Sequence, residues 1–191
     1  MDTQKLSSSF LTLIVPFLFF ILFTTLPTTQ ASSTSSQLVE NICKETINYL
    51  KCIEALEADP RTKSPKNLNA FAKDSIGLAI KNAKESLYFI HNLLKINKMT
   101  SSSSSGSTRR AVLKQCVASY KAVIGSFKSA RTELSEDAMS ANYDVMVAVD
   151  YIDSCESEMS LKNVQVLSMA ERNNQVRLYS SIGYVITNKL D

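Results

Sequence analysis

The sequence predicts an all-α protein: an up-down-up-down four-helix bundle with an N-terminal helical hairpin and two disulfides. Apolar residues recur at heptad-like spacing in three long stretches, which is typical of helices that bury one stripe in a bundle. An apolar leader is followed by four cysteines, an even number. The 191 residues include four Gly and four Pro, so few residues interrupt helices.

Length and composition set the class of protein. The length favours one domain, and a hydrophobic content of 45% is enough for one core. With a net charge of +3 and 20% charged residues, composition indicates neither disorder nor nucleic-acid binding.

Residues 1–31 are predicted to be a secretory signal peptide. Phe10 to Phe23 is nearly continuous apolar sequence, and small residues precede an expected cleavage after Ala31. The alternative is an uncleaved anchor, but the run is shorter than the roughly 20 apolar residues of a membrane span. We therefore expect a secreted mature chain, 32–191, with no membrane association after cleavage and no N-linked glycan, since Asn-x-Ser/Thr is absent.

The first mature segment, 32–59, is predicted to be a helical hairpin. Cys43 and Cys52 are nine residues apart, about 13 Å along a continuous helix. A disulfide needs Cα atoms within about 7 Å, so if these two pair, the chain folds back between them, with Thr46–Asn48 as the corner. Residues 59–65, which include two prolines, separate the hairpin from the bundle.

Residues 66–191 are predicted to form the bundle. The apolar stripes of its first three helices step by four and three: Ile76, Ile80, Ala83, Leu87, Ile90, Leu94; Val112, Cys116, Tyr120, Val123, Phe127, Ala130, Leu134; and Ala141, Val145, Ala148, Ile152, Cys155, Met159. Cys116 and Cys155 lie on two of these stripes and are equidistant from a turn near Ser135, which favours their pairing.

The fourth helix is expected from about Asn163 to Lys189. Its stripe is clear late, at Leu178, Ile182, Val185 and Lys189, but polar residues 171–175 blur it, so its first half is expected to be exposed or irregular. The expected connections are a flexible loop over Ser101–Ser107, a tight turn at Leu134–Asp137 and a break near Ser160.

We find no set of residues for catalysis, a metal or a cofactor. His91, the single histidine, is expected on a helix surface with no nucleophile nearby. There is no CxxC pair for zinc and no glycine-rich phosphate loop. Basic residues such as Lys81, Lys84, Arg109 and Arg110 are dispersed and not interleaved with aromatics, which argues against nucleic acid as a partner.

The residues resemble the plant invertase and pectin methylesterase inhibitor family across the mature chain. The resemblance rests on Ile42–Thr46, Ala55–Arg61, Leu113–Cys116 with Tyr120 and Ala122, Ser154–Glu156, and Val185–Asn188, together with the cysteine intervals. It implies pairing of the first cysteine with the second and of the third with the fourth. It also implies a protein without catalytic activity that forms a 1:1 complex with a target enzyme and covers its substrate cleft. The expected location is the apoplast or the vacuole.

The resemblance leaves the target enzyme open between pectin methylesterase and acid invertase. Invertase inhibitors of this family carry Pro-Lys-Phe at the start of the third bundle helix, where this chain has Ala138-Met139-Ser140. Ala55–Arg61 and Val185–Asn188 look closer to pectin methylesterase inhibitors, although Tyr179 stands where many of these have a fifth cysteine. The balance favours pectin methylesterase.

The expected target-binding residues are Ala138, Met139, Ser140, Asn142 and Asp144, where the family's target-facing surface begins. The alternative for these positions is an ordinary solvated helix surface. For the whole protein, the alternative class is a non-inhibitory structural or signalling relative that kept the bundle and lost the contact surface.

Overall fold

The computed structural model describes residues 32–100 and 104–190, with side chains from residue 37 and none for 98–100. The expected signal peptide lies outside the described residues. Contacts set Thr34–Asp191 apart as the second of two units, and it contains both disulfides and the four long helices. Among the described residues, no helix is long and apolar enough to cross a membrane.

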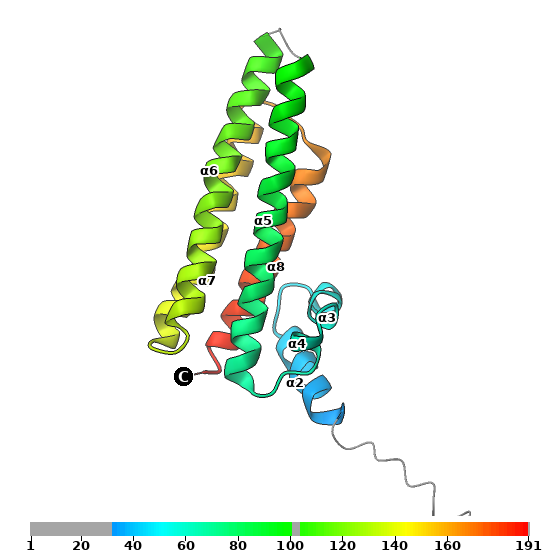
Figure 1. Ribbon diagram of the computed structural model, residues 1–191, viewed down its shortest axis with the longest axis vertical. Helices are drawn as coiled ribbons and strands as arrows, with labels where there is room; N and C mark the ends of the chain where they lie inside the picture. Colours follow the sequence, from blue (N-terminus) through cyan, green and yellow to red (C-terminus); the bar gives the residue numbers. More distant parts are fainter. Residues whose placement is uncertain (1–31, 101–103, 191) are drawn as a thin grey trace, which may run out of the picture. The chain divides into compact units, whose positions relative to one another are not determined.

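The second unit is all-α, as predicted (Figure 1). Three short helices come first, α2 (Ser32–Lys44), α3 (Tyr49–Glu57) and α4 (Pro60–Lys63). Four long helices follow, α5 (Leu68–Thr100), α6 (Ser104–Glu133), α7 (Ala138–Leu161) and α8 (Leu167–Thr187). In the bundle α5 packs against α6, α6 against α7, and α7 against α8, and α8 packs back against α5.

The hairpin forms because the chain reverses between Cys43 and Cys52. The Thr46 hydroxyl donates to the Cys43 carbonyl, and the Asn48 side chain accepts from Lys51 N, capping α3. The reversal brings the two cysteine Cα atoms to 5.4 Å, and they form a disulfide. The expected corner at Thr46–Asn48 is confirmed.

The expected linker, 59–65, contains a helical turn that sequence patterning missed. Asp59 caps α4 by accepting from Arg61 N, and Pro60 occupies the first helical position, where its missing N–H costs nothing. The Thr62 side chain is buried and donates to Leu56 O at 2.6 Å, fixing this turn against α3.

The first three bundle helices pack the stripes predicted for them against the core, with Ile80, Leu87 and Leu94 of α5 half-buried. Every residue of the second stripe from Val112 to Ala130 is fully buried, and so are Ala141 to Cys155 of the third. Cys116 and Cys155 face one another with Cα atoms 4.7 Å apart and form the second disulfide. The tight turn falls where it was expected, between Glu133 and Ala138.

The predicted loop over Ser101–Ser107 is wrong for its second half. Ser104–Ser107 form the first turn of α6, residues 101–103 lying outside the described residues. Gly106 is buried, and its carbonyl accepts from the buried Asn97 side chain of α5 at 3.0 Å. Packing between the two helices therefore overrides the loop preference of the serine run.

The fourth helix was predicted too long and too exposed. It begins at Leu167 and ends at Thr187, so that Lys189 lies beyond it and is exposed. Its first half is regular, and Met169, Asn173 and Val176 are buried. The reason is that α8 has two buried faces, one toward the bundle and one toward the hairpin.

These two faces belong to separate apolar clusters. Met169 and Val176 join the core shared with α5, α6 and α7. Leu178, Ile182, Val185 and Ile186 join a second cluster with the hairpin and the start of α5. Only the second face has the apolar stripe that the sequence pattern revealed.

Candidate target-binding surface

The N-terminus of α7, where the expected binding residues begin, is capped by Asp137. Its Oδ1 accepts from Met139 N and Ser140 N at 3.0 and 3.1 Å, and its Oδ2 accepts from the Ser140 hydroxyl at 2.6 Å. The hydrogen bond from the Ser140 side chain, followed by that from its backbone, holds the pKa of Asp137 below its ordinary value. The hydroxyl of Ser140 therefore serves the helix cap.

Asn142 joins α7 to the end of α8. Its Nδ2 lies within hydrogen-bonding distance of Tyr184 O, Thr187 Oγ1 and Asn188 Oδ1, at 3.1, 2.8 and 3.0 Å. Its donor atom is already occupied by these contacts. Ala138 and Asp144 are half-exposed.

Met139 is different, because its side chain is 71% exposed. Tyr143, 68% exposed, and Met146, 49% exposed, follow it at intervals of four and three residues. Residues at this spacing share one helix face, so these three make an apolar stripe on the outside of α7. We call it the α7 stripe.

Sequence reasoning missed Tyr143 and Met146. The signal was present, since α7 has a second run of apolar residues at helical spacing beside the buried run of Ala141, Val145 and Ala148. Large exposed apolar side chains that adjoin one another mark interaction sites more often than scattered ones do. The structure thus shows an exposed apolar stripe that includes one expected binding residue and two new ones.

The charged residues of α7 all carry the same sign. Helix α7 carries Asp144, Asp150, Asp153, Glu156 and Glu158, and it contains no Lys or Arg. Its surface is therefore acidic as well as locally apolar.

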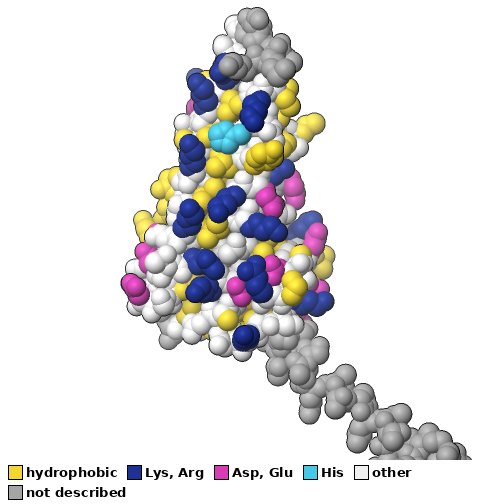
Figure 2. Space-filling view, viewed as in Figure 1, with side chains coloured by type: hydrophobic (Ala, Val, Ile, Leu, Met, Phe, Trp, Pro, Cys, Tyr) yellow, Lys and Arg dark blue, Asp and Glu magenta, His cyan; other side chains and the backbone are white. Residues whose placement is uncertain are grey.

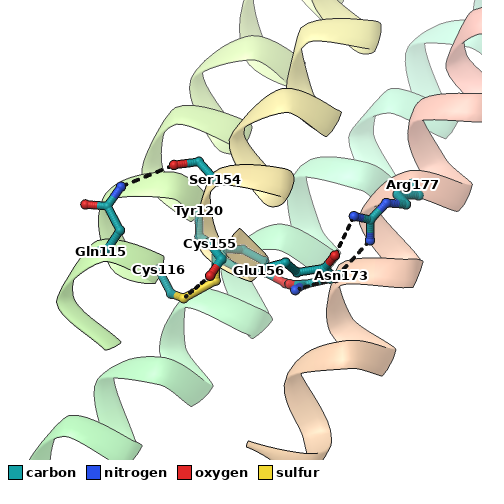
Figure 3. Close-up of a disulfide and its surroundings, with 8 residues drawn as sticks. All are labelled: Gln115, Cys116, Tyr120, Ser154, Cys155, Glu156, Asn173 and Arg177. Carbon is teal, nitrogen blue, oxygen red and sulfur yellow. Dashed lines mark hydrogen bonds and ion pairs between the residues drawn. A yellow bond between two sulfur atoms is a disulfide. The ribbon is translucent and has the colours of Figure 1, made fainter. Parts of the chain in front are cut away.

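Arg177 of α8 neutralises part of that acidity (Figure 3). Its guanidinium donates to both carboxylate oxygens of Glu156, at 3.0 and 2.7 Å, and also pairs with Asp153. Asn173 Nδ2 donates to Glu156 Oε1 at 2.9 Å and Asn173 Oδ1 accepts from the Tyr120 hydroxyl, so the network runs from α6 through α8 to α7. The network fixes α7, and with it the α7 stripe, against the rest of the bundle.

The network predicts a pH-dependent stability. Arg177, by its hydrogen bond, is the largest cause that lowers the pKa of Glu156, and Asn173 adds to it, while burial acts in the opposite direction. A lowered folded-state pKa stabilises the fold above the unfolded value, about 4.3, and this contribution is lost as pH falls through the folded value.

We expect Glu156→Gln to lower the free energy of unfolding at pH 7 by about 1 kcal/mol, because the 39% exposed side chain is partly screened by water. The difference from the parent should shrink as the pH falls below the unfolded value and disappear once Glu156 is protonated in the folded protein. Urea titrations at pH 7, 5 and 3 measure it, with Glu158→Gln as a control of equal charge on the same helix. A difference that stays constant over this range would assign the cost to packing and not to charge.

A cleft of about 430 Å³ lies between the end of α7 and the start of α8. Its polar lining residues are Glu156, Ser160, Asn163, Gln165 and Asn173. The side chains of Glu156 and Asn173 already bind one another, and Glu156 also binds Arg177. His91, exposed on α5 as expected, lies on another helix. Within the described part of the chain, no group of three or more His, Cys, Asp or Glu side chains could hold a metal ion.

The chain is similar to known proteins in sequence and in fold. Residues 37–186 match the model of the plant invertase/pectin methylesterase inhibitor family. A pectinesterase inhibitor of Actinidia deliciosa is 31% identical over 151 residues, 78% of this chain and 76% of the relative. An Arabidopsis thaliana protein named cell wall/vacuolar inhibitor of fructosidase 2 is 26% identical over 126 residues, 65% of this chain and 66% of the relative.

The fold also matches a solved structure. A mutant form of a pectin methylesterase inhibitor from Arabidopsis superposes with a TM-score of 0.67 at 22% identity, covering 80% of this chain and 97% of the other. At this identity the match supports the fold alone.

Proposed function

Since this chain belongs to the plant invertase/pectin methylesterase inhibitor family, a family of enzyme inhibitors and not of enzymes, we propose that it inhibits a pectin methylesterase. It binds the enzyme as a 1:1 complex and covers the substrate cleft. No bond is made or broken. The α7 stripe is the observation that carries this proposal, because an inhibitor of this kind needs an exposed, rigid surface with large apolar anchors.

Two observations support pectin methylesterase as the target. The relative with 31% identity is named a pectinesterase inhibitor. Helix α7 starts with Ala138-Met139-Ser140, in the place where the family's invertase inhibitors have Pro-Lys-Phe. Acid invertase is the second candidate, favoured by the relative named as an inhibitor of fructosidase.

The proposed location is the cell wall or the vacuole. The name of the fructosidase inhibitor includes both compartments. Two disulfides and the absence of a free cysteine among the described residues fit an oxidising environment outside the cytosol. We also propose that residues 1–31 are removed as a signal peptide.

The test is a parallel titration of the purified protein against a plant pectin methylesterase and an acid invertase at mildly acidic pH. We expect stoichiometric loss of the esterase activity. Loss of invertase activity alone would show that acid invertase is the target. If neither activity falls while circular dichroism shows a folded helical protein, the chain is a non-inhibitory relative.

The α7 stripe makes a sharper prediction. Tyr143→Ala removes the central aromatic side chain, and we expect the inhibition constant to rise about thirtyfold, the effect of losing about 2 kcal/mol at an interface anchor. Leu167→Ala is the matched control, because Leu167 is 95% exposed but belongs to α8. Equal inhibition by both variants would show that the enzyme docks elsewhere.

A further inference from the structure

The outer face of α5 and α6 carries a strong positive charge. In the described parts of these helices, ten Lys and Arg side chains accompany three carboxylates, and all ten cations are exposed or half-exposed. Figure 2 shows these cations spread over α5 and α6. Lys81 and Lys84, which are far in the sequence from Arg109 and Arg110, lie on the helix that packs against theirs. We call this surface the basic face.

Helical periodicity aligns three of the lysines on each of the two helices. Lys73, Lys84 and Lys95 are eleven residues apart, which is close to three turns, so they form one line along α5. On α6, Lys114, Lys121 and Lys128 are seven apart and form a second line.

Two contacts fix how the lines are aligned. Arg131 Nε donates to Lys73 O at 3.1 Å near one end, and Asn97 Nδ2 donates to Gly106 O at 3.0 Å near the other. In this antiparallel register three pairs of cations lie at the same level of the two helices: Lys73 with Arg131, Lys84 with Lys121, and Lys95 with Arg109. Successive pairs follow one another at about 16 Å along the helix axis.

The basic face is not neutralised from within. The cations of the ion pairs found among the described residues lie on other elements than α5 and α6: they are Lys44, Lys51, Arg61, Arg177 and Lys189. Its charge is therefore available to a partner, and the acidity of α7 lies on a different helix.

The surface is also hollowed between the two helices. A groove of about 440 Å³ is lined by Lys73 and Ile80 of α5 and by Lys128 and Arg131 of α6. Three cations from two helices thus border one depression.

The chemistry of the face favours an extended polyanion over a protein. Among the described residues of α5 and α6, Tyr88 and Ile96 are the large apolar side chains that are exposed, and both belong to α5. Protein interfaces depend on apolar and aromatic anchors, which this face lacks along α6. Seven of the ten cations are lysines, which act as flexible point charges and impose no fixed geometry on an anion.

We propose that the basic face binds an acidic polysaccharide, a polyuronate with free carboxylates. This inference rests on the proposed function, because a pectin methylesterase hydrolyses methyl esters and leaves a polymer of that kind. Binding through α5 and α6 leaves the α7 stripe free for the enzyme. The inhibitor would then be held where the esterase has already acted.

The test measures binding of polygalacturonate to the purified protein by calorimetry at pH 6 over a series of salt concentrations, with no enzyme present. Fully methyl-esterified pectin is the uncharged comparison. We expect binding to polygalacturonate that weakens steeply with salt, and no binding to the ester. Because no enzyme is present, a failure of the proposed inhibition cannot be mistaken for a failure of this binding.

A matched pair of variants locates the site. Lys84→Gln with Lys121→Gln removes the central pair, and we expect affinity for polygalacturonate at low salt to fall about tenfold with a shallower salt dependence. Lys66→Gln with Lys162→Gln removes the same charge outside α5 and α6 and should change affinity less than about twofold. Equal losses in both, or no binding to polygalacturonate, would overturn the proposal. So would binding to single-stranded DNA or anionic phospholipid vesicles in the absence of binding to polygalacturonate.

Discussion

Replacing Cys116 and Cys155 together with alanine is expected to lower the free energy of unfolding by about 4 kcal/mol. The disulfide spans a sequence separation of 39 residues, and its loss restores the conformational entropy of that loop to the unfolded chain. Both cysteines are fully buried between α6 and α7, so small cavities add to the cost. In a domain of this size the melting temperature should fall by roughly 12 °C. Thermal unfolding followed by circular dichroism at pH 7 measures it.

The hairpin disulfide supplies the control. Cys43→Ala with Cys52→Ala removes the same chemical group, but the sequence separation is 9, which predicts a smaller loss of about 2.5 kcal/mol. The order of the two effects is the diagnostic result. A bundle variant that melts with the parent protein, or above the hairpin variant, would show that the link between α6 and α7 contributes little.

The bundle could be predicted from sequence because its first three helices each bury one continuous apolar stripe. Heptad-like spacing encodes such a face directly, and the positions of Cys116 and Cys155 on two stripes already pointed to a contact between them. The turn between Glu133 and Ala138 could be predicted equally well, since the apolar stripes on either side stop there.

The fourth helix was harder to predict because it packs against two neighbours, the bundle and the hairpin. Its face toward the hairpin has an ordinary apolar stripe, whereas its face toward the bundle includes Asn173, Ser180 and Gly183. These residues are polar or small, yet they are buried. Ser180 donates to Val145 O, and a Cβ on Gly183 would lie 3.0 Å from Val145 Cγ1, so α7 and α8 approach closely here. A pattern of hydrophobicity does not record such contacts.

The candidate surfaces depend on tertiary structure in another way. Whether Tyr143 and Met146 are exposed depends on whether another element packs over them, and their spacing alone is that of a core stripe. The cations of the basic face come from two helices separated by a chain reversal. Their convergence becomes visible only when the antiparallel register is known.

Asn173 gives the second large effect that we expect. Asn173→Leu should destabilise the protein by about 3 kcal/mol, because it removes two hydrogen bonds and leaves buried polar groups with fewer partners. The Tyr120 hydroxyl donates to Asn173 Oδ1 at 2.8 Å, and both side chains are fully buried. Burial is the largest cause that raises the pKa of Tyr120, so the hydroxyl stays neutral and continues to require an acceptor. Urea unfolding at pH 7 measures the loss.

A double-mutant cycle separates this network from simple packing. Tyr120→Phe alone should cost about 1 kcal/mol, since Asn173 keeps its bond to Glu156. In Tyr120→Phe with Asn173→Leu both partners are apolar, and the Tyr120 hydroxyl that would lack its acceptor is gone, so the double variant should be more stable than Asn173→Leu alone. Costs that simply add would mean that Asn173 acts by shape. A recovery in the double variant would mean that a polar contact in the core sets how α6 and α8 fit together, and hence how firmly α7 presents its stripe.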